Sequence, residues 1–182
     1  MRLSTPRIPP LPKEEWSDEV RGLLPSDRTP LNIFTTLVRH PSLFKRWTVF
    51  GGYILSRSSL PARERELLIL RTGYRCNSPY EFHQHTRIGL DAGLTADEIK
   101  RLTQPLDANA RWSAEDAVLL TAADELHDDQ MITDATWAKL RERWDEKQLI
   151  DILFTVGQYT LVSMVLNTLG VQTEDGSKGF PT

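Results

Sequence analysis

Cysteine is nearly absent from this sequence of 182 residues, in which Cys76 is the single example. One cysteine cannot form a disulfide within the chain, which fits a reducing compartment. An excess of positive charge is also lacking, because 22 lysine and arginine residues face 25 aspartate and glutamate residues and leave a net charge of -3. Without a basic stripe, nucleic acid is not an expected partner.

Signals for export or membrane insertion are missing too. Residues 1–12 hold four prolines and two arginines but no apolar core of the kind that a secretory signal needs. The longest apolar stretch, residues 149–171, is interrupted by Asp151, Gln158 and Asn167, which favours a buried core or interface helix over a membrane span. We therefore expect a cytoplasmic protein with no membrane partner.

Strand signals are absent as well, since no Asn-Gly or Asp-Gly turn lies between runs of alternating apolar and polar residues. Apolar residues instead recur at helical spacing, and capping residues such as Ser17, Thr95 and Ser113 precede several of these stretches. The expected helices lie between Ser17 and Pro25, over residues 32–39 and 42–56, from Pro61 to a break at Cys76, over 78–93 and 95–102, from Ser113 onward, and over 134–144 and 145–169.

This pattern predicts one all-α domain of about eight helices within residues 1–182. Hydrophobic residues make up 40% of the chain, enough for a core of its own. Proline fixes φ and has no backbone N–H, so the arm of residues 1–12 should be extended. The polar tail, residues 172–182, should form an arm or be disordered.

Titratable side chains gather in the two predicted helices on either side of the break at residues 76–79. Glu81 and His85 are four residues apart, so they share one helical face and can touch. If the two helices pack antiparallel, Glu66 on the first helix returns alongside His85. A carboxylate keeps a neighbouring imidazole charged or oriented, and burial raises a carboxylate pKa. Such a group suits general acid–base catalysis.

Plainer interpretations of these residues stay open at this point. Ser78, Pro79 and Glu81 have the spacing of an N-terminal capping box, in which Glu81 would only satisfy backbone N–H groups. Glu66 ends a run of charged residues and fits a surface position, and His85 fits a hydrogen-bonded core histidine. Two ligands on one helix, Glu81 and His85, are too few to specify a metal, so no metal site is expected.

Several segments together resemble the carboxymuconolactone decarboxylase family, which includes alkylhydroperoxidase D. The segments are ERELLILR, YEFHQH, GLTADEI, NIF, the HP before Leu43, and LNTLGV. The resemblance extends over roughly residues 32–171 and implies an antiparallel all-α bundle that assembles into homo-oligomers such as dimers, trimers or hexamers. The long apolar final helix and five tryptophans also suggest more apolar surface than one subunit hides.

The peroxidase branch of that family carries a glutamate, a Cys-x-x-Cys pair and a histidine at fixed spacing. On this chain Glu66 and His85 take the outer positions, whereas Ser78 and Glu81 stand where the two cysteines would be. Cys76 lies two residues before the first thiol position. A dithiol peroxidase cycle needs one thiolate to attack peroxide and a second thiol to resolve the sulfenic acid, so the sequence disfavours peroxidase activity.

The decarboxylase-like branch instead implies an enzyme that uses a Glu–His pair and needs no metal or organic cofactor. We expect His85 and Glu81 to supply the proton and Glu66 to orient His85. The expected substrate is a small carboxylated or aromatic-derived metabolite. The residues predicted to contact it are Tyr80, Phe82, Trp47, Phe50 and Ser78. The alternative is a non-catalytic helical oligomer in which the Glu–His pair is a buried structural network.

Overall fold

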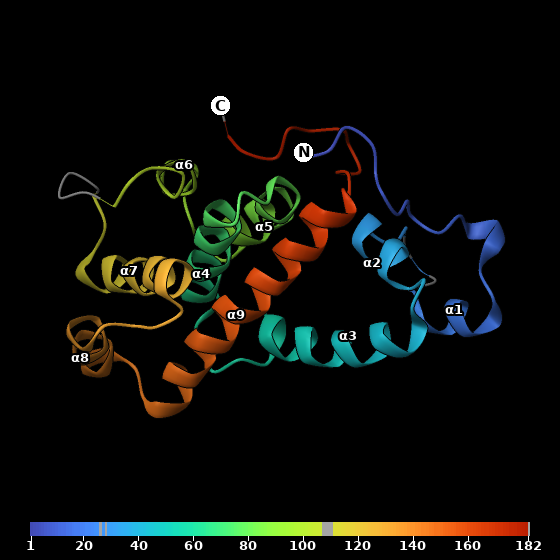
Figure 1. Ribbon diagram of the computed structural model, residues 1–182. Helices are drawn as coiled ribbons and strands as arrows, with labels where there is room; N and C mark the ends of the chain where they lie inside the picture. The colour runs from blue at the N-terminus through green and yellow to red at the C-terminus, as the bar shows by residue number, and fades with distance from the viewer. Residues whose placement is uncertain (26, 28, 107–110, 182) are drawn as a thin grey trace.

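The computed structural model describes residues 1–25, 27, 29–106 and 111–181, and within them it shows helices and no strand (Figure 1). The helices are η1 (Lys13–Glu15, a 3-10 turn), α1 (Asp18–Leu23), α2 (Asn32–Leu37), α3 (Pro41–Ser56), α4 (Ala62–Arg75), α5 (Pro79–Asp91), α6 (Ala96–Arg101), α7 (Ala114–Asp129), α8 (Asp134–Arg143) and α9 (Glu146–Leu169). The all-α prediction is confirmed, with nine α-helices in the described part of the chain where about eight were expected.

Capping residues explain where most helices begin. Ser17 and Ser113 accept hydrogen bonds from backbone N–H groups in the first turns of α1 and α7. Thr95 and Glu98 form a reciprocal capping box at the start of α6, as predicted. At the other end of the chain, Gly170 adopts φ 72° and stops α9, a conformation that glycine reaches at little cost.

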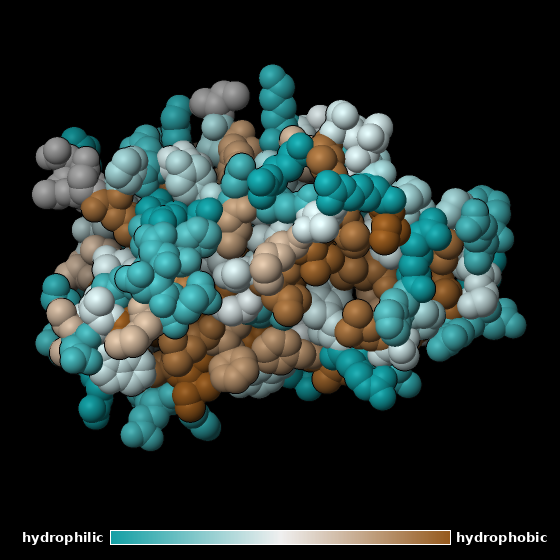
Figure 2. Space-filling model, viewed as in Figure 1, coloured by the Kyte–Doolittle hydropathy of each residue, from teal (hydrophilic) through white to brown (hydrophobic). Residues whose placement is uncertain are grey.

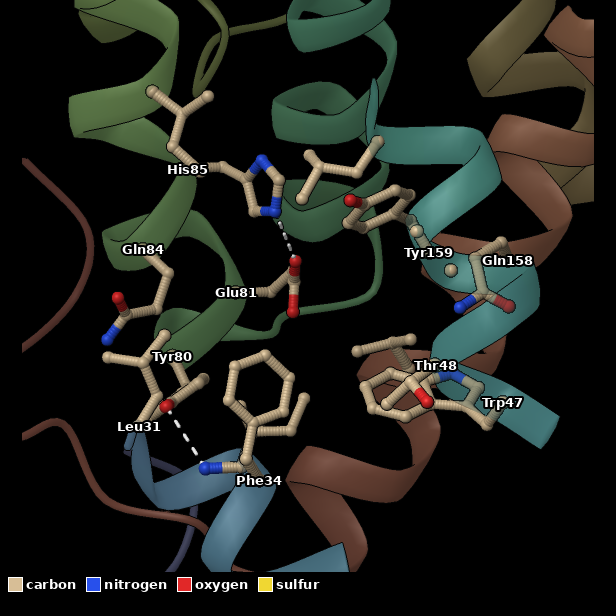
Figure 3. A pocket seen from close by; sticks show the side chains of 16 residues that line it. Leu31, Phe34, Trp47, Thr48, Tyr80, Glu81, Gln84, His85, Gln158 and Tyr159 are labelled. Carbon is tan, nitrogen blue, oxygen red and sulfur yellow. Dashed lines mark hydrogen bonds and ion pairs between the residues drawn. The ribbon is translucent and has the colours of Figure 1, made fainter. Parts of the chain in front are cut away.

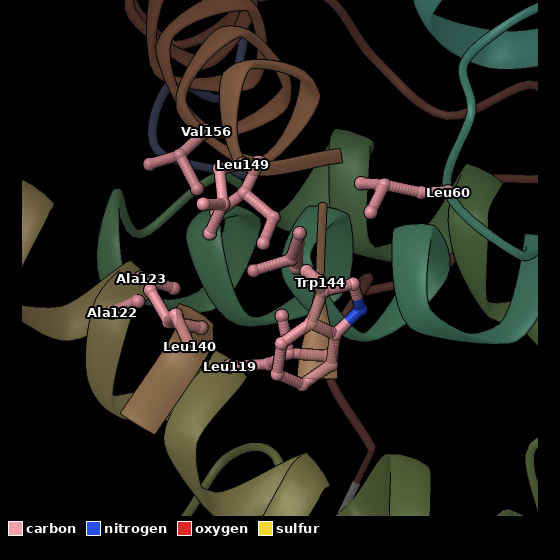
Figure 4. Packing of buried hydrophobic residues seen from close by; sticks show 10 residues of the cluster. Leu60, Leu119, Ala122, Ala123, Leu140, Trp144, Leu149 and Val156 are labelled. Carbon is pink, nitrogen blue, oxygen red and sulfur yellow. The ribbon is translucent and has the colours of Figure 1, made fainter. Parts of the chain in front are cut away.

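Helix α4 lies at the centre of the molecule and packs against α5, α7 and α9 (Figure 1). Four consecutive residues, Leu67 to Leu70, are fully buried. Because consecutive helical side chains point in different directions, this run means that neighbours surround α4 on every side. Leu68 joins the cluster with α7, α8 and α9 that Figure 4 shows, and Ile69 packs on Ile54 and Tyr159.

Arg71 carries a positive charge into this interior, and each nitrogen of its guanidinium donates a hydrogen bond. Its side chain is 2% exposed, and its guanidinium donates two hydrogen bonds to the Asp124 carboxylate at 2.8 and 2.7 Å. A further N–H group donates to the carbonyl oxygens of Leu102 and Gln104. Because a buried charge is tolerated only when it is paired, this network fixes α4 against α7 and the segment after α6.

The N-terminal arm, residues 1–12, contains no helix and packs along the domain. The backbone N–H of Arg7 donates to the Leu169 carbonyl, and that of Leu11 donates to the Thr35 carbonyl. The first hydrogen bond joins the arm to the last residue of α9, and the second joins it to α2. The arm therefore ties the end of α9 to α2.

The described residues 172–181 form an arm that is fastened to the domain, the first of the two forms expected for this tail. Glu174 accepts hydrogen bonds from the Tyr80 hydroxyl and the Gln84 amide, both on α5. Phe180 packs edge-on against Phe82, with ring centroids 5.3 Å apart. The tail looked polar in sequence, but its few hydrogen-bonding and aromatic side chains fasten it over α5 (Figure 1). The last position of the predicted tail, residue 182, lies outside the described residues.

Helix α9 is, among the described residues, the one helix long and apolar enough to cross a membrane by length and composition. Within its most apolar window 56% is buried inside the protein. The remainder joins α3 in an apolar face, and Figure 2 shows hydrophobic residues gathered along the course of α9 and α3. We call this the α3–α9 face; its exposed members are Leu43, Val49, Phe50, Tyr53, Ile150, Leu153, Phe154, Leu161 and Met164.

Candidate active site

The site is built on α4 and α5, which fold back on each other through a tight turn. Asn77 adopts φ 47°, and the Ser78 backbone N–H bonds the Gly73 carbonyl at 2.8 Å. Gly89 then lets the two helices approach closely, because a Cβ atom there would lie only 3.1 Å from Leu70. A Cβ atom at Gly73 would lie 3.6 Å from the Phe82 nitrogen, an ordinary contact. This antiparallel pairing brings Glu66 back beside α5.

Glu66, His85 and Glu81 form a linear chain of contacts in the interior. The Nδ1 atom of His85 lies 2.7 Å from Glu66 Oε2, and its Nε2 atom lies 3.0 Å from Glu81 Oε1. The three residues are 0%, 6% and 4% exposed, respectively, so the chain is shielded from bulk solvent. Arg65 Nε, at 3.4 Å from Glu66 Oε1, places a second cation at the far end.

Both carboxylates act on the charge of His85. Burial by itself lowers the pKa of His85, but the hydrogen bonds that its ring donates to Glu66 and Glu81 outweigh burial and raise the pKa from 6.5 to about 9. His85 is therefore an imidazolium at neutral pH. The ring of Tyr159 stands edge-on to it, with centroids 4.9 Å apart. Burial, and then the charges of Glu81 and Glu66, hold the pKa of Tyr159 well above its usual 10.0, so its hydroxyl stays neutral.

The structure decides between the two interpretations of Glu81. Ser78 occupies the N-cap position of α5, but its side chain makes no capping hydrogen bond. The Ser78 Oγ atom is buried without any hydrogen-bond partner. The Glu81 side chain turns to His85 instead, so the capping-box interpretation is wrong. Glu66 is likewise not a surface residue, because α4 is surrounded by other helices.

A cavity of about 240 Å³ opens in front of Glu81 and His85 (Figure 3). Its wall is mostly apolar and aromatic, with a few polar groups. The lining residues are Leu31, Ile33, Phe34, Trp47, Thr48, Gly51, Gly52, Leu55, Tyr80, Glu81, Gln84, His85, Ile88, Gln158, Tyr159 and Val162. Helices α2, α3, α5 and α9 all contribute, so the cavity depends on the whole fold. Glu66 lies behind His85, outside the wall.

Comparison with known proteins finds a similar family. Residues 41–124, which include α4, α5 and all three members of the charged chain, match the sequence profile of the carboxymuconolactone decarboxylase family. Residues 41–124 of this chain are thus similar to the carboxymuconolactone decarboxylase family. No curated protein matches the sequence. The match confirms the resemblance drawn from the sequence segments over these residues.

Solved structures of related fold cover nearly the whole chain. An alkylhydroperoxidase AhpD core protein from Ralstonia eutropha, an uncharacterized peroxidase-related protein, has a TM-score of 0.80 at 18% identity over 92% of this chain and 93% of that one. A peroxidase-related protein from Silicibacter sp. has 0.74 at 16% over 98% and 94%. The debrominase Bmp8 in complex with 2,3,4-tribromopyrrole has 0.78 at 10% over 95% and 94%. At these identities the likeness shows a shared fold.

The structure brings some of the predicted substrate-contacting residues to the cavity and excludes others. Trp47 and Tyr80 line it, and the Tyr80 hydroxyl is held by Glu174 and the Ile33 backbone N–H. Three predicted residues, Phe82, Phe50 and Ser78, are not part of the wall. The reasons differ from residue to residue.

Phe82 shares α5 with Glu81 and His85, but it points to the opposite side, where it is fully buried against Leu67, Leu70 and Phe180. Phe50 points outward from α3, is 38% exposed and packs on Phe154 of α9. Ser78 is fully buried in the turn before α5. The sequence placed these residues in the right helices, but helix spacing alone does not tell which face of a buried helix meets a cavity.

Residues of α3 and α9 form a part of the wall that the sequence did not predict. Gln158 and Tyr159 come from α9, and Thr48 and Gly51 come from α3. The one signal in the sequence was a polar residue, Gln158, inside a long apolar stretch. Glycines in the middle of α3 leave open space where side chains would otherwise fill the cavity.

The cavity wall contains no thiol, and the described residues contain no cluster of metal ligands. The Sγ atom of Cys76 lies 3.7 Å from His127 Nδ1, and Cys76 is not a lining residue of the cavity. Burial raises the pKa of its thiol, which disfavours the reactive thiolate. Within the described residues no group of three or more His, Cys, Asp or Glu side chains is arranged to hold a metal ion.

The raised pKa of His85 predicts a specific pH dependence of stability. The imidazolium is stabilised in the folded state, so its contribution is fully present below pH 6.5 and is lost as the pH rises through about 9. The free energy of unfolding, measured by urea denaturation, should fall over this window. This fall in the free energy of unfolding should vanish in His85→Gln. It should persist in His83→Gln, which alters a histidine outside the cavity. Equal pH profiles for wild type and His85→Gln would contradict the assignment.

Proposed function

We propose that this protein is an enzyme that moves a proton on a small, mostly apolar molecule, with Glu81 facing the substrate and His85 controlling its charge. The observation that carries the proposal is the asymmetry of the Glu81 carboxylate. Its Oε1 atom contacts His85, and no hydrogen bond to Oε2 is seen among the described residues. In Figure 3 this second oxygen points away from His85 into the cavity.

The two nitrogens of His85 are both engaged by carboxylates, so the imidazole acts through Glu81. A proton taken from a carbon acid would move to Glu81 and leave its electron pair on the substrate. Return of that proton to another atom of the substrate completes an isomerisation. In a decarboxylation, the C–C bond breaks, its electron pair stays on the substrate and carbon dioxide leaves. The carbanion then takes a proton that passes from the His85 imidazolium through Glu81, and water restores the proton on the ring. Neither sequence of steps needs a metal or an organic cofactor.

Two alternatives remain as competing hypotheses. A sealed pair of helices would favour a purely structural Glu–His network, whereas the cavity that reaches His85 favours an enzyme. A peroxidase would need a reactive thiol next to His85. The thiol positions hold Ser78 and Glu81, and Cys76 lies outside the cavity, so this activity is disfavoured.

A carbon-acid probe tests the proposal. A β,γ-unsaturated γ-lactone incubated in D2O should exchange its acidic C–H and isomerise faster with the enzyme than without it, followed by proton NMR. The Glu81→Gln variant keeps the shape of the side chain but removes the base, so exchange should slow by about 10²-fold or more. Glu115→Gln, on the exposed start of α7, should leave the rate unchanged. Equal rates for Glu81→Gln and wild type would overturn the role of Glu81.

We also propose that a second copy of the chain covers the α3–α9 face in a homo-oligomer. Several large apolar side chains there are exposed, including Phe154 at 53% and Met164 at 58%. Contiguous apolar patches of this kind usually mark a contact surface. The face lies beside the cavity wall, because α3 and α9 contribute residues to both. Phe50 of α3 belongs to the face, and Gln158 of α9 lines the cavity.

Light scattering after size exclusion tests this assembly. The wild type should elute at a multiple of the 20.8 kDa subunit mass. Phe154→Glu should shift it toward the monomer by placing a charge in the interface, whereas Leu90→Glu, at a similarly exposed position on α5, should not. A wild-type protein of 20.8 kDa at micromolar concentration would contradict the proposal.

A further inference from the structure

Gln158 presents a polar group in the cavity wall that has no partner among the described residues. The residue lies in the middle of α9 and is 7% exposed. The hydrogen bonds of the described residues include none to its side-chain amide. In Figure 3 the amide lies across the cavity from Glu81, with its nitrogen toward the Glu81 side. Because Gln158 lines the cavity, a ligand that fills the cavity can form the hydrogen bonds that its amide offers.

The Gln158 amide has open space beside it. Its Nε2 atom would lie 3.4 Å from a Cβ atom at Gly51, in van der Waals contact, and the glycine leaves that volume open. Trp47 and Tyr159 form apolar walls on either side. The amide is therefore one of a few polar groups in a mostly apolar wall, the arrangement by which ligand sites fix orientation.

The charges around the cavity restrict what can bind there. Among the described residues, no lysine or arginine lines the wall. The positive charge of His85 is already shared between two carboxylates, and Glu81 brings an acidic group to the surface of the cavity. A substrate carboxylate would be desolvated in an apolar space, without a cation of its own and beside Glu81. That combination is strongly unfavourable.

We infer that the substrate is an uncharged, single-ring-sized molecule that donates a hydrogen bond or an acidic C–H to Glu81 and bonds the Gln158 amide at its other end. This inference rests on the proposed function and narrows it. The cavity volume of about 240 Å³ lies below the usual range for drug-sized ligands, which sets the size. Of the two reactions considered above, isomerisation of a neutral molecule fits the site better than decarboxylation of an anion. Gln158 is then a specificity-determining residue.

Three ring compounds of similar size test the inference by ligand-observed NMR titration at pH 7.5: benzamide, benzoate and toluene. Benzamide and benzoate have nearly the same shape but differ in charge, so benzamide should bind at least tenfold more tightly. Toluene offers no hydrogen bond. Gln158→Leu should weaken benzamide binding roughly fivefold, the effect of one lost hydrogen bond. Toluene binding should stay the same or strengthen.

The outcomes separate this inference from the function on which it rests. Benzoate binding as tight as that of benzamide would overturn the neutral substrate while leaving the acid–base role of Glu81 intact. Equal losses of benzamide and toluene binding in Gln158→Leu would show a packing role and overturn the specificity role. If none of the three compounds binds the wild type, the inferred neutral ring-sized substrate falls, whereas the proton-exchange assay with Glu81→Gln still decides the proposed function.

Discussion

The chain from Glu66 through His85 to Glu81 is the interaction on which the site depends. Three ionisable groups in the interior are tolerated because the imidazolium lies between two carboxylates, and removal of one partner would leave an uncompensated charge. The geometry requires α4 and α5 to pack antiparallel at short distance, which Gly89 allows. The same contacts raise the pKa of His85 and leave one oxygen of Glu81 for the cavity. Fold, charge and chemistry are thus set by one arrangement.

The relation to the family's peroxidase branch becomes clearer from the two positions where its cysteines would be. Ser78 is buried in the turn and makes no side-chain hydrogen bond, whereas Glu81 meets both His85 and the cavity. The second position therefore carries a carboxylate in place of a thiol. Glu66 and His85 keep their places, and His85 contacts both carboxylates. The proposed acid–base chemistry rests on this replacement.

Helices and the charged chain could be predicted from sequence because they follow from local rules. Thr95 with Glu98 marks a helix start, and the four-residue spacing of Glu81 and His85 puts both on one face. The cavity wall could be predicted only in part, because it is assembled from helices far apart in the chain. Phe82 and Phe50 have the expected chemistry but face other neighbours. Gln158 gave only a polar interruption in an apolar helix, and its place in the cavity wall depends on how α9 packs against α3 and α5.

The central claim is that His85 is an imidazolium held between Glu66 and Glu81. The most direct measurement is a pH titration of its ring nitrogens by 15N NMR, with the signals assigned by their loss in His85→Gln. The account predicts that both nitrogens carry protons at pH 7 and that the ring titrates with a midpoint near 9. A neutral ring at pH 7, or a midpoint near the ordinary 6.5, would contradict it.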